Sequence, residues 1–212
     1  MFSGKGQINM DSNLGREIFE ICKDERYINI FETGTWNGEG STICVMNAII
    51  NKKDSVLYSL EADKSQFNKA TEFWSGKSTK NKLNLINGVL HTKIADKQHV
   101  RQSAETNMLW LECPDEWHKW YDGEKVLLDQ TKVIDLSNIK EIDIIILDGG
   151  EFSTEEDFNV LFKKNPRVII LDDCVVYKCR EIRQRLLDDI NWDLYKEDLN
   201  DRHGWSIFMR TC

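Results

Sequence analysis

The amino-acid sequence predicts an α/β fold built on an open, mostly parallel sheet of about seven strands, with helices on both faces. Short apolar runs rich in Ile, Val and Leu alternate with stretches of helical periodicity, which is the pattern of successive strand and helix units. Two of these runs, 142–147 and 168–171, are almost continuously apolar, as central strands buried on both faces are. No linker rich in Pro, Gly or Ser divides the 212 residues, so we expect residues 1–212 to form one domain.

The first expected element is a helix that precedes the sheet. Its apolar residues Leu14, Ile18 and Ile21 recur at helical spacing and form one face. Asp11 or Ser12 provides a side chain that can cap the start of this helix. We therefore expect a helix docked on the core ahead of the first strand.

Strands and helices are then expected to alternate to the end of the chain. The apolar runs expected to form parallel strands are residues 27–32, 56–60, 83–86, 142–147 and 168–171. Helical patterns follow four of them, at 41–50, 67–74, 158–162 and 182–190. The last helical pattern places Ile190 on its apolar face, and residues 192–209 are expected to add a C-terminal antiparallel hairpin. This order predicts a doubly wound, Rossmann-like sheet, in which ligands bind outside the carboxyl ends of the strands.

A long interval separates the third and fourth expected strands and is too long for a plain crossover helix. We expect an insertion at about 91–140, and its aromatic cluster consists of Trp110, Trp117, Trp120 and Tyr121. Aromatic faces stack well on sugar rings and other planar or apolar ligands. Tryptophans in a small α/β domain more often pack an insertion onto the core, and we favour that interpretation.

Charge and composition exclude several classes of partner. The 28 Lys and Arg residues against 36 Asp and Glu residues give a net charge of −8, which repels nucleic-acid phosphates and anionic membrane surfaces. No apolar run approaches the roughly 18 to 20 residues of a membrane span, and residues 1–10 lack the layout of a signal peptide. The six cysteines form no C-x-x-C pair. We expect a cytoplasmic protein with reduced thiols and no nucleic-acid or membrane partner.

Polar residues, most of them acidic, gather where a sheet of this kind binds its ligand. The residues at the carboxyl ends of the expected strands are Glu32, Glu61, Asn87, Asp148, Asp172 and Asp173. The carboxyl ends of parallel strands meet at one edge of the sheet, so these side chains are expected to share a ligand site.

A glycine-containing loop, residues 33–40, follows the first strand, which ends at Glu32. Spacings of four and two separate Gly34, Gly38 and Gly40, whereas a dinucleotide-binding loop needs G-x-G-x-x-G to approach the pyrophosphate. This spacing disfavours a dinucleotide-dependent oxidoreductase. The glycines either let the chain turn beside a ligand without pyrophosphate, with Glu32 receiving a cationic or hydrogen-bond-donating group, or serve a generic turn.

Glu61 ends the second strand, where a carboxylate accepts hydrogen bonds from both hydroxyls of a ribose. Together, the loop and Glu61 resemble motif I and the following acidic position of class I S-adenosylmethionine-dependent methyltransferases, in which the loop holds the methionine part of the cofactor. The resemblance covers roughly residues 27–209. It implies S-adenosylmethionine as the cofactor, with binding residues Glu32, Gly34, Thr35, Gly38, Ser41, Glu61, Gly88 and Asp148.

Three carboxylates, those of Asp148, Asp172 and Asp173, stand at the ends of neighbouring central strands. They repel one another unless they are protonated, solvated or bridged by a cation, and oxygen ligands favour Mg²⁺ or Mn²⁺ over zinc. The pattern is similar to the sugar O-methyltransferases of the macrocin and novobiocin type, in which such acids hold Mg²⁺ beside the acceptor hydroxyls. That resemblance implies these three residues as metal ligands. Alternatively, they cap the helices that start near Ser153 and Val175.

The general base is where this chain departs from that family. The sugar O-methyltransferases commonly carry a second Asp two positions after the first, and this chain has Gly150 there. Glu151, one residue further along, is the replacement we consider. The candidate catalytic residues are Asp148, Glu151 and Asp173. On chemistry alone His91 and His118 are alternatives, because a neutral imidazole accepts protons near pH 7.

The leading hypothesis is an S-adenosylmethionine-dependent O-methyltransferase that acts, with divalent-metal assistance, on a hydroxyl of a sugar, glycan or related small molecule. One alternative is a metal-independent methyltransferase with another acceptor, such as nitrogen. A second alternative is a non-catalytic nucleoside-binding domain of the same fold, which the glycine at Gly150 leaves open. The sequence leaves the oligomeric state open, a homo-oligomer included.

Overall fold

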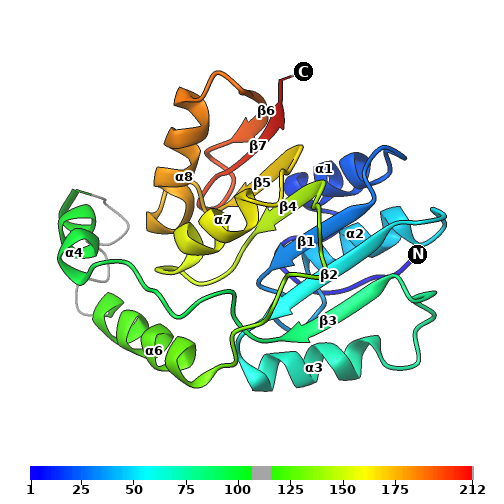
Figure 1. Cartoon of the computed structure of the whole chain (residues 1–212), viewed down its shortest axis with the longest axis horizontal. Coiled ribbons are helices and arrows are strands. Elements are labelled where there is room, and N and C mark those ends of the chain that lie inside the picture. Colours follow the sequence, from blue (N-terminus) through cyan, green and yellow to red (C-terminus); the bar gives the residue numbers. More distant parts are fainter. Residues whose placement is uncertain (107–115, 212) are drawn as a thin grey trace.

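The computed structural model describes residues 1–106 and 116–211, so Trp110 lies outside the described part. Seven strands form one sheet in the order β3-β2-β1-β4-β5-β7-β6 (Figure 1). The strands are β1 Asn29–Thr33, β2 Val56–Glu61, β3 Leu83–Asn87, β4 Ile144–Leu147, β5 Val168–Asp172, β6 Trp192–Asp198 and β7 Trp205–Arg210.

The strand directions confirm the predicted doubly wound, Rossmann-like α/β fold with its C-terminal antiparallel hairpin. Strands β1 to β5 pair in parallel. Strand β7 is antiparallel to both of its neighbours, β5 and β6, so six of the described strands share one direction. The chain runs outward from β1 to β3 and then crosses to β4 on the other side of β1. The strand order therefore reverses between β1 and β4, which is where such sheets bind their ligands.

Helices cover both faces of the sheet (Figure 1). They are α1 Asn13–Cys22, α2 Ser41–Ile49, α3 Lys64–Trp74, α4 Lys97–Thr106, α6 Trp117–Gln130, α7 Thr154–Phe162 and α8 Tyr177–Asp188. Helices α1, α2 and α3 pack on one face with Ile30 and Ile144, whereas α7 and α8 pack on the other with Phe31 and Ile145. Successive strand residues point to opposite faces, so neighbours in β1 and in β4 belong to different cores. No helix in the described ranges is both long enough and apolar enough to cross a membrane.

Strands β1 and β4 each begin two residues later than their apolar runs predict. The side chain of Asp143 binds the backbone at the start of β1. Its Oδ2 accepts hydrogen bonds from the backbone N–H groups of Ile28, at 2.8 Å, and Asn29, at 2.9 Å. This side chain therefore contacts the start of β1 beside the backbone hydrogen bond from the N–H of Asp143 to the carbonyl oxygen of Asn29, at 2.8 Å.

The sequence-based prediction for the last helix is wrong at Ile190. Helix α8 ends at Asp188, and Ile190 follows it with 91% of its surface exposed. Ile182 and Leu186 are buried as the periodicity predicts. Asp189 adopts an extended conformation with ψ of 113°, which ends the helix before the pattern reaches Ile190.

Helices α4 and α6 lie between β3 and β4, in the interval where an insertion was expected, and Figure 1 shows them to one side of the sheet. Trp117 and Tyr121 of α6 are buried against Phe152 and Tyr177. These two aromatic residues therefore pack the insertion onto the rest of the protein, as we favoured. Trp120 is 52% exposed.

Candidate functional site

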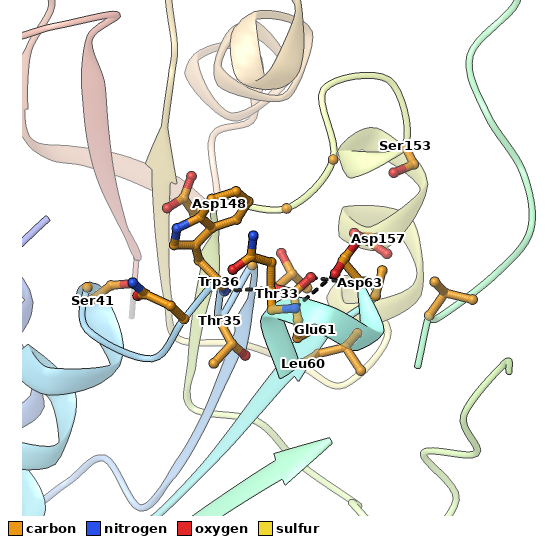
Figure 2. Close-up of a pocket in the computed structure, with 18 of the residues that line it drawn as sticks. Thr33, Thr35, Trp36, Ser41, Leu60, Glu61, Asp63, Asp148, Ser153 and Asp157 are labelled. Atoms are coloured by element: carbon orange, nitrogen blue, oxygen red, sulfur yellow. Dashed lines mark hydrogen bonds between the residues drawn. The ribbon is translucent and has the colours of Figure 1, made fainter. Parts of the chain in front are cut away.

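A cavity of about 750 Å³ lies at the carboxyl ends of β1, β2 and β4. Its wall combines the loops after these strands, which converge in Figure 2, with residues 5–8 and one side of α6. The predicted site residues that line the cavity are Gly34, Thr35, Ser41, Glu61, Gly88, Asp148 and Asp173. The predicted residues that lie outside the lining are Glu32, Gly38, Glu151 and Asp172.

The loop after β1 packs directly on the loop after β4. Gly34 has a φ of +86°, a conformation that favours glycine. A Cβ atom at this position would overlap the carbonyl oxygen of Asp148 and lie 2.5 Å from its carbonyl carbon. The backbone N–H groups of Gly34 and Thr35 both donate to the carbonyl oxygen of Leu60, at 3.0 and 3.1 Å. The ends of β1, β2 and β4 therefore meet closely because Gly34 has no side chain.

The other two predicted glycines have packing roles. The carbonyl oxygen of Gly38 accepts a hydrogen bond from Trp74 Nε1 at 3.1 Å, and a Cβ on Gly38 would lie 2.8 Å from the same nitrogen. Gly88 lines the cavity, and its N–H donates to the carbonyl oxygen of Glu61 at 3.1 Å. A Cβ on Gly88 would overlap the side chain of Ile134. Their contact with a cofactor stays a prediction.

Glu32 is fully buried beneath the glycine loop. Its carboxylate accepts hydrogen bonds from the hydroxyls of Ser41 at 2.5 Å, Thr42 at 2.7 Å and Ser59 at 2.5 Å. Burial raises the pKa of Glu32, and the three hydroxyls oppose that shift. Strand alternation explains this position, because Thr33 points to one face and Glu32 to the face that α2 covers. Glu32 therefore anchors the start of α2, and its contact with a cofactor stays a prediction.

Glu61 ends β2 and lines the cavity. Its Oε2 accepts a hydrogen bond from the N–H of Trp36 at 2.6 Å, and its Oε1 accepts one from the N–H of Asp63 at 2.8 Å. Burial raises the pKa of Glu61 to about 7, although both backbone hydrogen bonds act in the opposite direction. Each carboxylate oxygen accepts more than one hydrogen bond, so Glu61 keeps acceptor capacity toward the cavity.

Two polar groups of the cavity wall were not singled out by any sequence motif. Thr33 Oγ1 is buried and has no hydrogen-bond partner among the described residues. A Cβ on Gly149 would lie 3.1 Å from that oxygen and 3.2 Å from Asp157 Oδ2, so both groups border the space over Gly149. The other oxygen of Asp157 lies 3.1 Å from His91 Nε2. A buried hydroxyl without a partner is unfavourable, so this wall suits a polar ligand atom.

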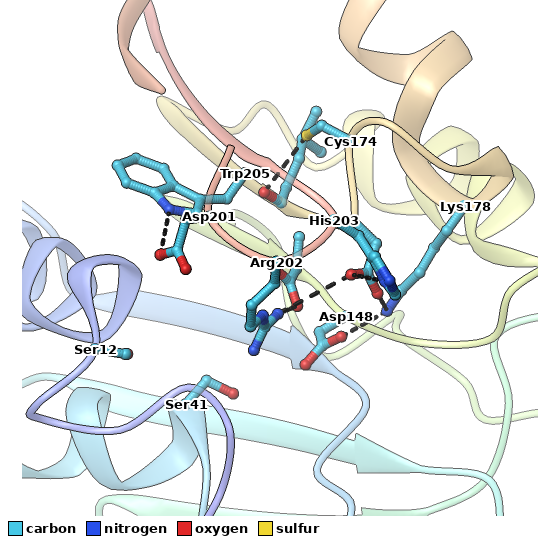
Figure 3. Close-up of polar contacts among 12 residues, drawn as sticks. Ser12, Ser41, Asp148, Cys174, Lys178, Asp201, Arg202, His203 and Trp205 are labelled. Carbon is cyan, nitrogen blue, oxygen red and sulfur yellow. Dashed lines mark hydrogen bonds and ion pairs between the residues drawn. The ribbon is translucent and has the colours of Figure 1, made fainter. Parts of the chain in front are cut away.

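The predicted acidic cluster forms. One carboxylate oxygen from each of Asp148, Asp172 and Asp173 lies within 4.8 Å of the other two. Figure 3 shows that Lys178 of α8 reaches into this cluster. Its Nζ donates to Asp148 Oδ1 at 2.6 Å and to Asp173 Oδ2 at 2.8 Å. Arg202 donates to the carboxylate of Asp172. Each of the three acids therefore has a cationic partner, either Lys178 or Arg202.

This arrangement does not fit the magnesium or manganese ion that the resemblance implies. A divalent ion binds carboxylate oxygens at about 2.0 to 2.6 Å and would face the ammonium of Lys178 across the same oxygens. Burial opposes the charge of Lys178, but the carboxylates of Asp148, Asp173 and Asp172 outweigh burial and hold its pKa well above the ordinary value. The cluster therefore already contains a cationic side chain.

Lys178 was not among the predicted site residues. It stands in the first turn of α8, where a positive charge opposes the helix dipole. That unfavourable placement is the sequence signal that could have identified it, because a lysine there needs carboxylate partners. The side chain of Lys178 is 6% exposed.

Gly150 stands at the position to which the resemblance assigns a second Asp, and the surroundings of Gly150 are crowded. A Cβ there would lie 2.5 Å from Ser153 Oγ and 2.7 Å from Glu124 Cδ. The carboxylate of Glu124 takes this place and accepts hydrogen bonds from the N–H of Phe152 at 3.1 and 3.2 Å. Glu124 comes from α6 and lines the cavity, and nothing in the local sequence pattern relates it to Gly150.

Three residues were considered above as the general base, namely Glu151, His91 and His118. All three lie outside the cavity lining. Burial raises the pKa of Glu151 to about 7. His91 Nε2 lies 3.1 Å from Asp157 Oδ1. His118 is exposed, and its ring centroid lies 3.6 Å from that of Trp117. A catalytic role for any of them stays a prediction.

The chain is similar in structure to several solved proteins. No protein-family model matches the chain, and no curated protein matches it in sequence. A protein from Klebsiella pneumoniae described as a candidate O-methyltransferase shares 15% sequence identity, covers 95% of this chain and 81% of its own, and has a TM-score of 0.62.

Two other similar structures were solved with the methyl donor or its product. The O-methyltransferase from Bacillus cereus in complex with S-adenosylhomocysteine (SAH) has 14% identity and a TM-score of 0.60, over 93% of this chain and 80% of its own. TomG from Streptomyces achromogenes, an O-methyltransferase of tomaymycin synthesis in complex with S-adenosylmethionine, has 13% identity and a TM-score of 0.60, over 93% and 79%. The chain has the Rossmann-like fold of these S-adenosylmethionine-dependent O-methyltransferases.

Proposed function

We propose that this chain is an S-adenosylmethionine-dependent O-methyltransferase that methylates a hydroxyl of a sugar, glycan or related small molecule. The observation that carries the proposal is the cavity between β1 and β4, where the glycine loop, Glu61 and the acidic strand ends face one space. The fold shared with O-methyltransferases solved with SAH or S-adenosylmethionine supports the same assignment. The sugar class rests on the resemblance at Asp148, Asp172 and Asp173.

The cavity fits the proposed cofactor in size and in polar groups. Its volume of about 750 Å³ lies within the range of about 300 to 1,000 Å³ that is usual for small-molecule sites. Glu61 accepts hydrogen bonds and suits the hydroxyls of a ribose. Thr33 Oγ1 is a buried hydroxyl without a partner in the described part of the chain, and it is available to a polar ligand atom. When bound, S-adenosylmethionine supplies an electrophilic methyl group on a sulfonium.

The protein has to orient the acceptor hydroxyl and remove its proton. We assign proton removal to Asp148, because its carboxylate lines the cavity at the end of β4 whereas Glu151 lies outside the lining. The proton passes from the acceptor oxygen to the Asp148 carboxylate as that oxygen becomes a methyl ether. Residues 5–8 and the Leu127 side of α6 complete the wall of the cavity around this step.

A metal-assisted form of the same reaction is the second candidate function. The observation that favours it is the cluster of Asp148, Asp172 and Asp173, whose oxygens lie within 4.8 Å of one another. It requires Lys178 to leave two of these carboxylates. Dependence of turnover on divalent ions separates the two forms.

Calorimetric titration with SAH tests the cofactor class, with NAD⁺ as the control ligand. We expect micromolar binding of SAH and no binding of NAD⁺. Glu61→Gln should weaken SAH binding by about tenfold or more, because the amide is a weaker acceptor than a carboxylate. Asp54→Asn removes an exposed carboxylate and should leave the affinity unchanged. Absence of SAH binding would refute the proposed function.

Turnover then tests the acceptor class. Purified protein, S-adenosylmethionine and a panel of sugars, nucleotide sugars and phenols would be assayed for release of SAH. We expect release with a hydroxyl-bearing acceptor and retention of activity in EDTA. Binding of SAH without turnover of any acceptor would favour the non-catalytic nucleoside-binding alternative.

A further inference from the structure

Three carboxylates gathered at the strand ends would ordinarily recruit a cation from solution, and in this protein a side chain already lies among them. We propose that the ammonium of Lys178 permanently occupies the position of a divalent metal, and that its remaining N–H group faces the cavity as a donor to the acceptor oxygen. The first part of this proposal concerns the chain alone. The second part rests on the proposed function.

The contacts of Lys178 are those of a cation held at a fixed position. Its Nζ lies 2.6 Å from Asp148 Oδ1 and 2.8 Å from Asp173 Oδ2, so it bridges the ends of β4 and β5. The third acid, Asp172, is paired with Arg202. His203 Nδ1 lies 3.4 Å from the second oxygen of Asp173. Every acid of the cluster therefore has a basic partner within the chain, and the cations of Lys178 and Arg202 offset two of the three negative charges that would attract Mg²⁺.

Helix α8 fixes the direction of the Lys178 side chain. The residues on either side of it, Tyr177 and Cys179, are both buried, and Cys179 belongs to the core beneath β4 and β5. The backbone of Lys178 therefore cannot shift without disturbing that core. The side chain enters the cluster from an anchored turn, unlike a flexible surface lysine.

The ammonium has one N–H group beyond those used by the two carboxylates. A lysine ammonium carries three donors. Two reach Asp148 and Asp173, and the third has no acceptor among the described residues. Lys178 also lines the cavity, next to Asp148 and Gly149. Under the proposed function, this donor holds the acceptor oxygen beside the Asp148 carboxylate and stabilises the negative charge that develops on it.

Binding of Mn²⁺ tests the proposal without any cofactor or acceptor. The electron paramagnetic resonance signal of free Mn²⁺ would be measured as wild-type protein, Lys178→Met and Lys163→Met are added. We expect no loss of signal with wild type or with Lys163→Met, which changes an exposed lysine. Lys178→Met removes the competing ammonium and should bind about one equivalent of Mn²⁺, at least about tenfold more tightly than wild type.

Two results would overturn the proposal. One is tight Mn²⁺ binding by the wild-type protein. The other is a folded Lys178→Met protein that neither binds Mn²⁺ nor gains thermal stability from it. If Lys178→Met does not fold without Mn²⁺, the wild-type titration decides, because retention of the free Mn²⁺ signal supports the proposal and its loss refutes it.

Measurements of turnover test the role of the third N–H group of Lys178. Lys178→Met should lower kcat more than it changes the affinity for SAH, whereas a purely structural defect would lower both. An unchanged kcat would refute the positioning role. A protein that excludes Mn²⁺ as expected but does not bind SAH would refute the proposed function and leave the first part of the inference standing.

Discussion

Replacement of Gly34 by alanine tests whether the close approach of β1 and β4 builds the cavity. Gly34 has a φ of +86°, and a Cβ there would lie 2.5 Å from the carbonyl carbon of Asp148 and 3.1 Å from the N of Gly149. Both neighbours are backbone atoms of the loop after β4, so they cannot rotate away as a side chain would. The two loops must separate to admit the methyl group.

The expected loss of free energy of unfolding in Gly34→Ala has two parts. An alanine in the left-handed region costs about 1 to 2 kcal/mol. Forcing packed backbone apart adds about 1 to 3 kcal/mol. Gly34→Ala should therefore lower the free energy of unfolding by about 2 to 5 kcal/mol, with a fall in Tm of about 2 to 4 °C for each kcal/mol in a chain of this size.

Gly76 supplies the matched control. Its φ is +75°, and a Cβ there would have nothing within 4 Å. Gly76→Ala should show the conformational cost alone, about 1 to 2 kcal/mol. Urea unfolding of both variants, followed by tryptophan fluorescence, gives the difference that belongs to packing of the two loops. SAH titration of the folded proteins should show weaker binding for Gly34→Ala and no change for Gly76→Ala.

Equal losses of stability in the two variants would refute the packing argument. In that case the loops after β1 and β4 would have room for a methyl group, and the glycine would serve only its φ. If a destabilised Gly34→Ala protein bound SAH with normal affinity, the close packing of the two loops would stabilise the protein without shaping the cavity.

Three further measurements follow from the described contacts. Affinity for SAH should rise from about pH 6 to about pH 8, because burial raises the pKa of Glu61 to about 7 and the ionised form is the stronger acceptor; Glu61→Gln should flatten this calorimetric profile. Lys52→Met should lower the free energy of unfolding in urea by about 2 to 4 kcal/mol, because its Nζ donates to three backbone carbonyl oxygens; an unchanged midpoint would contradict this. Phe158→Ala should cost about 3 to 5 kcal/mol in the same assay, whereas Ile190→Ala at its 91% exposed site should stay within about 0.5 kcal/mol.

The arrangement of the sheet could be predicted because its signals are local. Each strand and helix has its own period of apolar residues, and a helix between two strands forces a parallel pairing. At the start of β1, a contact with a residue distant in sequence could not be predicted. Asp143 hydrogen-bonds to Ile28 and Asn29 across more than a hundred positions, and periodicity contains no trace of such a contact.

The location of the candidate site could be predicted from the sequence, whereas the contacts of several of its residues could not. Strand ends and glycine spacing identified the cavity loops, because they depend on topology. The task of Glu32 depends on which face of β1 it occupies, and a shift of one residue decides that. Lys178 and Glu124 reach the site from α8 and α6 through tertiary packing, so their partners could be found only in three dimensions.

Residues 5–8 form part of the cavity wall, so the position of a purification tag matters for binding measurements. This segment is held by the N–H of Gly6, which donates to the carbonyl oxygen of Glu39 at 3.1 Å, and by Phe2, whose backbone exchanges two hydrogen bonds with Asn47. A purification tag joined before these residues would lie close to the part of the cavity wall that they form. At the C-terminal end, the N–H of Thr211 donates a hydrogen bond to the carbonyl oxygen of Asn191. Figure 1 shows the C-terminus at another edge of the molecule. Binding and activity measurements are therefore best made on protein tagged at the C-terminal end.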